Sequence, residues 1–167
     1  MRLKKWDVRP IEEANLLNPA FCSLTLTAAI IGFYFQSQKN MPFLMSYLIL
    51  PIILHQDTRS KLPKRVNTLF APWIINNYEL RINFAERVIS TKPFTNEAIL
   101  MGFNKNLIKI DKDFSIYSPL PQHYIKNLEK RLDNEISEII HKSYFVGRWL
   151  ALSGSTETIM TLLGVRP

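Results

Sequence analysis

The sequence predicts a mainly α-helical protein with one small β-hairpin, in which a winged-helix-like unit is embedded in a helical domain. Two observations support this fold class. Residues 68–117 contain three short helix-like stretches and then two short strand-like runs, which is the element order of a winged helix. The rest of the 167 residues consists mostly of helical segments with clear start and stop signals, and this length can bury a core without disulfides. We therefore expect a single domain with three regions, residues 1–56, 57–118 and 119–167.

The winged-helix-like unit occupies most of the middle region. Thr68 is a candidate N-cap for its first helix, and Pro72 falls in the first turn, where a missing N–H does least harm. A polar turn at Asp111–Asp113 separates two short apolar runs, as in a hairpin. The pattern predicts helices over 69–77, 78–90 and 94–103 and strands over 107–110 and 114–117. This order indicates architecture and not function, because winged helices bind DNA, RNA or protein.

The first region begins with a basic arm in which Trp6 could act as an anchor, followed by a short helical turn over 11–17. Asn18 before Pro19 is a strong helix-start signal, and the helix should end near 39–40. A second apolar helix is expected over 41–55. The two apolar runs suggest a membrane hairpin as one alternative, but each is shorter than the roughly 20 residues that spanning needs. We favour two core helices and no membrane contact.

The last region should hold one long amphipathic helix that starts after Pro121 and continues to about residue 151. Its apolar positions recur every three or four residues, at Ile125, Leu128, Leu132, Ile136 and Ile139. Gly154 should break the helix. Ser155 should cap a last short helix, and Gly164 should end it.

Catalytic and cofactor motifs are not evident. The three histidines lack zinc-ligand spacing, the five glycines form no phosphate-binding loop, and no serine lies in a nucleophile elbow. Cys22 lies in an apolar run and is expected to be a buried small hydrophobe. We expect no enzyme activity, no cofactor and no metal, and the lone cysteine makes the cytoplasm the default compartment.

The formal net charge of +7 permits an acidic partner such as nucleic acid. A helix that reads DNA bases needs side chains such as Arg, Lys, Asn or Gln. The predicted third helix offers Asn96, and its only charge is Glu97. A winged-helix DNA-binding regulator is therefore the weaker alternative, and we expect any binding of DNA by the chain alone to be weak and non-specific.

Several stretches taken together suggest a family. The stretches EEANLLNPAF, LPIILHQDTRSKLP, INFAERVISTKPFTNEAILMGF and GRWLALSGSTETIMTLLGVRP, in this order, resemble the middle component of bacterial three-component ABC systems. This family includes the small accessory subunit of Lamassu-type antiphage defence systems. The chain is also similar to the tandem winged-helix accessory subunits of SMC complexes, although it has only one such unit.

The resemblance implies a non-catalytic adaptor with two protein partners. One is an SMC-like or RecF-like ABC ATPase, on which the subunit docks. The other is an effector such as a nuclease, which the subunit helps to hold inactive until foreign DNA is sensed. DNA would then be contacted indirectly, through the complex. The resemblance supplies no catalytic residues.

Two segments are predicted to form the partner interface, residues 55–65 and 147–167. They combine arginines, which pair well with carboxylates, with large apolar side chains. The alternatives are a solvated loop for the first segment and core packing for Trp149. The candidate interface residues are Arg59, Leu62, Lys64, Arg65, Arg148, Trp149 and Arg166.

Overall fold

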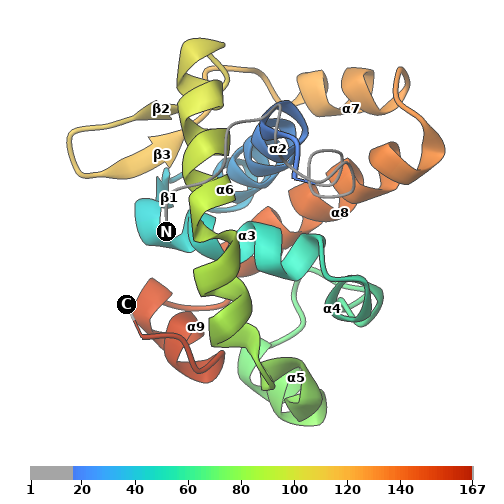
Figure 1. Cartoon of the computed structure of the whole chain (residues 1–167), viewed down its shortest axis with the longest axis vertical. Coiled ribbons are helices and arrows are strands. Elements are labelled where there is room, and N and C mark those ends of the chain that lie inside the picture. The colour runs from blue at the N-terminus through green and yellow to red at the C-terminus, as the bar shows by residue number, and fades with distance from the viewer. Residues whose placement is uncertain (1–16, 167) are drawn as a thin grey trace.

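The computed structural model of the chain describes residues 17–166. Helices predominate, and one small antiparallel sheet projects from the helical body (Figure 1), which confirms the predicted fold class. The predicted basic arm with Trp6 and the turn over 11–17 fall almost wholly outside these residues. The elements in order are α2 (Pro19–Ser37), β1 (Met41–Pro42), η2 (Phe43–Met45), α3 (Ser46–Ile53), α4 (Gln56–Ser60), α5 (Phe70–Asn76), η3 (Tyr78–Arg81), α6 (Phe84–Asn104), β2 (Lys109–Ile110), β3 (Ser115–Tyr117), α7 (His123–Glu129), α8 (Asn134–Ala151) and α9 (Thr156–Leu162).

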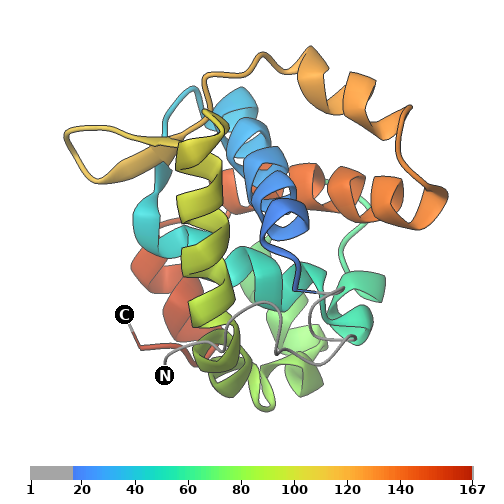
Figure 2. The ribbon, with the colours of Figure 1, turned by 45° about the horizontal axis from the view of Figure 1, so that its top comes forward.

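Helix α2 is the centre of the fold, and α8, α6 and α3 pack around it (Figures 1 and 2). Its start is as predicted. The Asn18 side chain accepts a hydrogen bond from the Ala20 N–H at 2.9 Å, and Pro19 takes the first helical position. The helix ends where Gln38 adopts a left-handed conformation and its N–H donates to the Tyr34 carbonyl.

Helix α2 is long and apolar enough to cross a membrane, by length and composition alone. However, 61% of its apolar window is buried inside the protein, and a core helix passes the same test. Contact with α8, α6 and α3 on several sides explains why its sequence is apolar almost all round.

The contact between α2 and α8 is unusually close. Ser143 of α8 donates a hydrogen bond of 2.7 Å to the Thr25 carbonyl, so backbone and side chain meet directly. A Cβ atom on Gly32 would lie 2.2 Å from the Tyr144 carbonyl oxygen. Glycine is therefore needed at this crossing.

The sheet contains the predicted hairpin and one further strand. Strands β2 and β3 pair antiparallel on either side of the turn at 111–114, as expected. Strand β1 pairs with the other edge of β3, with Met41 opposite Ile116, so the order is β1-β3-β2. We had predicted a helix from residue 41. The chain instead forms this strand and a 3-10 turn before α3 begins at Ser46.

The predicted second and third helices of the winged-helix-like unit are wrong in their boundaries. Residues 78–81 form a 3-10 turn, Asn83 has a φ of 57°, and one helix, α6, then runs through Pro93. Pro93 lacks the N–H that would bond to the Ile89 carbonyl, and its ring crowds that carbonyl, but Ile89 is 70% exposed, so water can take the place of the lost bond. The element order remains compatible with a winged-helix-like unit.

Two further predictions are corrected. Thr68 does not cap α5, because the N-cap is Leu69 and the helix begins at Phe70. The long C-terminal helix is two helices, α7 and α8, separated at residues 130–133. The apolar stripe continues across the break, since Leu128, Leu132 and Ile136 all pack against the same small cluster. The predicted Ser155 cap and the stop at Gly164, whose φ is 73°, are confirmed.

A single large cluster of buried side chains draws on all three regions of the chain. It includes Leu26 from α2, Phe84 from α6 and Trp149 from α8. A second, smaller cluster lies under α7.

Candidate partner-binding surfaces

The first predicted interface segment, residues 55–65, is built around the short helix α4. His55 caps it, and its Nδ1 lies 3.3 Å from the Thr58 N–H. Arg59 is not a free loop cation, because its Nη1 donates to the Ile53 carbonyl at 2.6 Å. Leu62 is half-buried against the core. Lys64 and Arg65 are exposed and remain available to a partner.

His55 also connects this segment to α6. Its Nε2 lies 3.3 Å from Nη1 of Arg87, whose Nη2 donates to the Leu80 carbonyl at 2.9 Å. Burial lowers the pKa of His55, the charge of Arg87 lowers it further, and Asp57 opposes both. The imidazole is therefore held neutral more strongly than a free histidine.

The second predicted segment contains a residue that is not at the surface. Trp149 is fully buried, so its prediction as an interface anchor is wrong and the alternative of core packing is correct. Its ring lies 4.7 Å from that of Trp73 and 5.0 Å from that of Phe70, and its Nε1 donates to the Thr68 carbonyl at 2.8 Å. The apolar period of α8 had already pointed to this result.

Arg148 and Arg166 differ in their surroundings. Arg148 donates through Nε and Nη2 to Gln36 Oε1, at 3.2 and 3.1 Å, and lies over the Phe35 ring. It therefore joins α8 to α2. Arg166 is exposed and makes no ion pair within residues 17–166.

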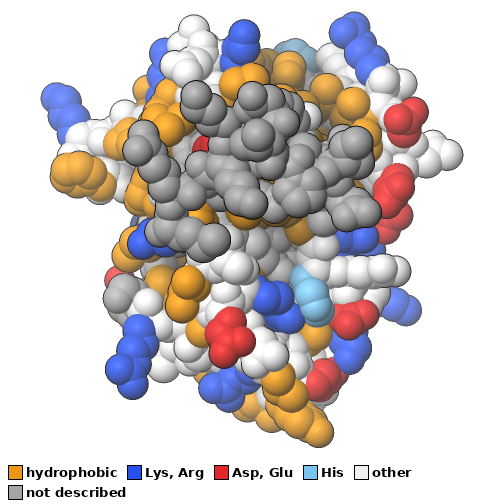
Figure 3. All heavy atoms as spheres, viewed as in Figure 1, with side chains coloured by type: hydrophobic (Ala, Val, Ile, Leu, Met, Phe, Trp, Pro, Cys, Tyr) orange, Lys and Arg blue, Asp and Glu red, His pale blue; other side chains and the backbone are white. Residues whose placement is uncertain are grey.

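The short helices of the two predicted segments lie apart from each other. Helix α4 and helix α9 lie on opposite sides of the molecule in both ribbon views, with α3 and α6 between them (Figures 1 and 2). On the face in Figure 3, Lys and Arg side chains lie at separate places, some at the edge and some beside the pale-blue histidine below the middle.

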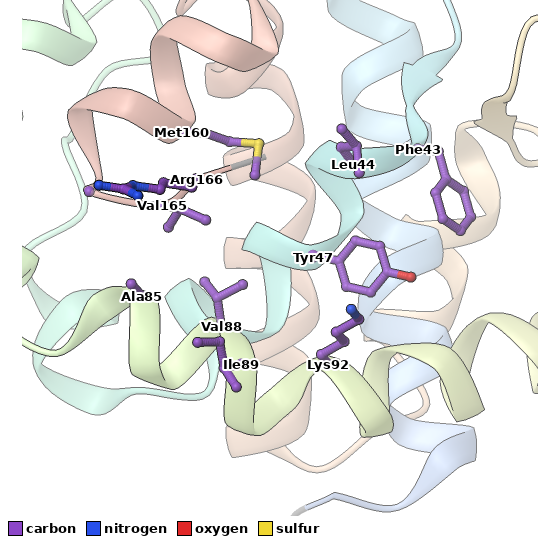
Figure 4. A pocket seen from close by; sticks show the side chains of 11 residues that line it. Phe43, Leu44, Tyr47, Ala85, Val88, Ile89, Lys92, Met160, Val165 and Arg166 are labelled. Carbon is purple, nitrogen blue, oxygen red and sulfur yellow. The ribbon is translucent and has the colours of Figure 1, made fainter. Parts of the chain in front are cut away.

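Sequence analysis missed an apolar groove between α6, the η2–α3 segment and the C-terminal end of the chain (Figure 4). Its volume is about 510 Å³. Two large aliphatic side chains at its edge are exposed, Ile89 at 70% and Leu44 at 45%. Its walls come from segments that are distant in sequence, so no local pattern predicts it. The aliphatic residues Leu44 and Ile89 are the one signal in the sequence that could have indicated an exposed apolar site. The lining residues are Phe43, Leu44, Tyr47, Ala85, Val88, Ile89, Lys92, Met160, Gly164, Val165 and Arg166.

The hairpin turn is held by Asp111. Its Oδ1 accepts the N–H groups of Asp113 and Ser115, both at 2.9 Å, and its Oδ2 accepts from Asn40 at 2.6 Å. The bond from Asn40 and the backbone bonds lower the pKa of the Asp111 carboxyl. Phe114 at the tip is 79% exposed and has a φ of 54°, so the turn presents an aromatic ring to solvent.

Metal-ligating and nucleophilic side chains were the remaining candidates for chemistry in residues 17–166. No group of three His, Cys, Asp or Glu side chains in this range is placed to hold a metal ion. Cys22 is fully buried, as predicted, and burial together with the nearby charge of Glu97 raises its pKa to about 12. Its thiol is therefore protonated at neutral pH and is a poor nucleophile.

Comparison with protein families identifies the chain. Residues 6–167 match the family described as ABC-three component (ABC-3C) system Middle Component 3. The chain belongs to this family. The resemblance found in the sequence is therefore confirmed at the level of a middle component of a three-component ABC system. Curated proteins and solved structures gave no match.

Membership of the middle-component family indicates what kind of contact the exposed surfaces can make. A middle component is one part of a multi-protein system, so its exposed apolar features are candidates for contact with other components. Among the described residues these features include the groove at Ile89 and the hairpin tip at Phe114, and the exposed cations Lys64 and Arg65 are candidates for charged contacts.

Proposed function

We propose that this middle component is a non-catalytic adaptor in an antiphage or anti-plasmid defence system of the Lamassu type. It docks on an SMC-like or RecF-like ABC ATPase in the cytoplasm and helps to restrain an effector such as a nuclease. The observation that carries the proposal is the match of residues 6–167 to the middle-component family, which makes the chain one part of a multi-protein ABC system.

The surface chemistry supports an adaptor. The large exposed aliphatic and aromatic side chains Leu44, Ile89 and Phe114 are the kind that become buried in protein–protein contacts. The protonated thiol of Cys22 offers no activated nucleophile. We therefore expect the purified chain to hydrolyse neither ATP nor DNA.

The experiment is reconstitution of the system from its three purified components. The tagged ATPase should retain this subunit, and the effector should show lower basal activity when the subunit is present than when it is omitted. Normal assembly and unchanged basal activity without the subunit would contradict the proposal. So would a hydrolytic activity that changes with point substitutions in this chain.

The DNA-binding regulator is less well supported. Within α6 the C-terminal half carries Glu97 as its only charge, and Asn96, its one candidate base reader, already accepts a hydrogen bond from the Tyr47 hydroxyl at 2.7 Å. Any binding should therefore be to phosphate groups and should weaken steeply with salt. A footprint at a defined sequence in physiological salt would favour the regulator.

A further inference from the structure

The groove between α6, η2–α3 and the C-terminal end has a floor and an exposed rim. Val88, Met160 and Val165 are at most 8% exposed and form the floor. Ile89 and Leu44 stand at the rim and face solvent. In Figure 4 side chains from all three segments are directed into the same space.

The groove is unlike a small-molecule site. Such sites combine apolar walls with a few buried polar groups that orient the ligand. The lining here offers one neutral polar side chain, Tyr47, and its hydroxyl already donates to Asn96. An occupant must therefore be held by apolar contact and by charges at the edge.

Those edge charges have one sign. Lys92 lies beside the Tyr47 ring at one end, and Arg166 lies at the other end, with Val88, Ile89 and Val165 between them (Figure 4). None of the described residues that line the groove is acidic. Within residues 17–166 neither cation has an ion-pair partner.

We propose that this groove binds an amphipathic helix of the ATPase component, with large apolar side chains on one face and carboxylates that reach Lys92 and Arg166. A helix laid in an apolar groove is a common way to recognise a protein segment, and its anchors recur at three or four residues. Opposite charges at both ends fix the position of the helix and exclude basic segments. The inference rests on the proposed function, because it takes the ATPase as the partner.

The test measures the affinity of the full chain for the purified ATPase component by titration calorimetry. Ile89→Glu replaces a large apolar contact at the rim by a carboxylate and should weaken binding by roughly 30-fold, as loss of a residue that carries much of the binding energy does. It should leave the fold intact, because Ile89 is 70% exposed. Leu100→Glu is the matched control, since Leu100 is on the same helix, is 60% exposed and does not line the groove. The control should bind within about twofold of wild type.

The charges are tested separately. Lys92→Glu with Arg166→Glu should weaken binding by about tenfold or more, whereas Lys105→Glu, an exposed cation at the end of α6, should not. A photo-crosslinking amino acid at position 89 then identifies the segment of the ATPase that enters the groove. Replacing the carboxylates of that segment by lysine should restore binding to the doubly reversed variant.

The outcomes separate the two proposals. If wild type does not bind the ATPase, the proposed function fails and this inference fails with it. If wild type binds and Ile89→Glu binds equally well, or if Leu100→Glu loses as much affinity, only the groove is wrong. A crosslinked segment without carboxylates, or a groove that mediates self-association in place of ATPase binding, would likewise overturn the inference alone.

Discussion

Gly147 of α8 lies directly against Ala29 of α2. A Cβ atom at position 147 would be 1.9 Å from the Ala29 carbonyl oxygen, which is backbone and cannot rotate away. This contact sets how closely the two main core helices approach.

Gly147→Ala should force α8 away from α2 and lower the free energy of unfolding by about 3 kcal/mol, near the upper end of overpacking effects. In a chain of this size the melting temperature should fall by roughly 6–12 °C. Gly154→Ala is the control, because a Cβ there meets nothing within 4 Å although its φ of 103° is unfavourable for alanine. A smaller loss for Gly147→Ala than for Gly154→Ala would mean that the helices are not held at this separation.

Trp149 should act on folding and not directly on binding. Trp149→Phe removes the hydrogen bond to the Thr68 carbonyl and part of the packing on Trp73, so we expect a loss of about 2–3 kcal/mol. Arg148→Ala should cost about 1 kcal/mol or less, because its bonds to Gln36 are partly exposed. Denaturant midpoints of both variants measure the difference, and equal midpoints would contradict the assignment of Trp149 to the core.

Folding stability should fall in mild acid because of His55. Its pKa is lowered in the folded state, mainly by burial and then by Arg87, so the unfolded chain takes up the proton first. Above about pH 6.5, the usual histidine pKa, His55 is neutral in both states and the fold keeps its full stability. As the pH falls below this value, the unfolded chain takes up a proton that the folded state disfavours, and the free energy of unfolding falls. The melting temperature of wild type should drop more steeply between pH 7 and 5 than that of His55→Asn.

His55→Asn is a suitable comparison because asparagine can still cap α4 but does not titrate. All other titrating groups are common to both proteins, so the difference in slope belongs to position 55. Parallel melting curves across this pH range would show that the His55–Arg87 contact does not shift the equilibrium.

Local signals in the sequence were reliable where one residue decides the structure. Asn18 and Ser155 were predicted as caps because their side chains bond to N–H groups two or three residues away. The break between α7 and α8 was missed because the apolar period continues on both sides of it. The sequence predicts a break between residues 90 and 94, but α6 runs through Pro93, with Val88 and Phe94 buried on either side of it.

The candidate surfaces were harder to predict because they depend on contacts between distant segments. The groove needs Ile89 of α6 beside Val165 near the end of the chain, and no periodic pattern relates these positions. In the same way β1 is a strand only because it meets β3. The density of charge led to the prediction of residues 55–65 as an interface. It could not show that Arg59 is bound to the Ile53 carbonyl while Lys64 and Arg65 are exposed.

The difference between the bound Arg59 and the exposed Lys64 and Arg65 can be tested by charge reversal. Arg59→Glu removes a charged hydrogen bond to Ile53 and places a carboxylate at the C-terminal end of α3, where the helix dipole disfavours it. It should lower the free energy of unfolding by about 2 kcal/mol. Lys64→Glu with Arg65→Glu should change it by no more than about 0.5 kcal/mol, because both side chains are exposed.

If this segment contacts the ATPase, the double variant should still reduce co-purification in moderate salt. Recovery of the partner at wild-type yield with a folded double variant would place the contact elsewhere, with the groove at Ile89 and the hairpin tip at Phe114 as the candidates left.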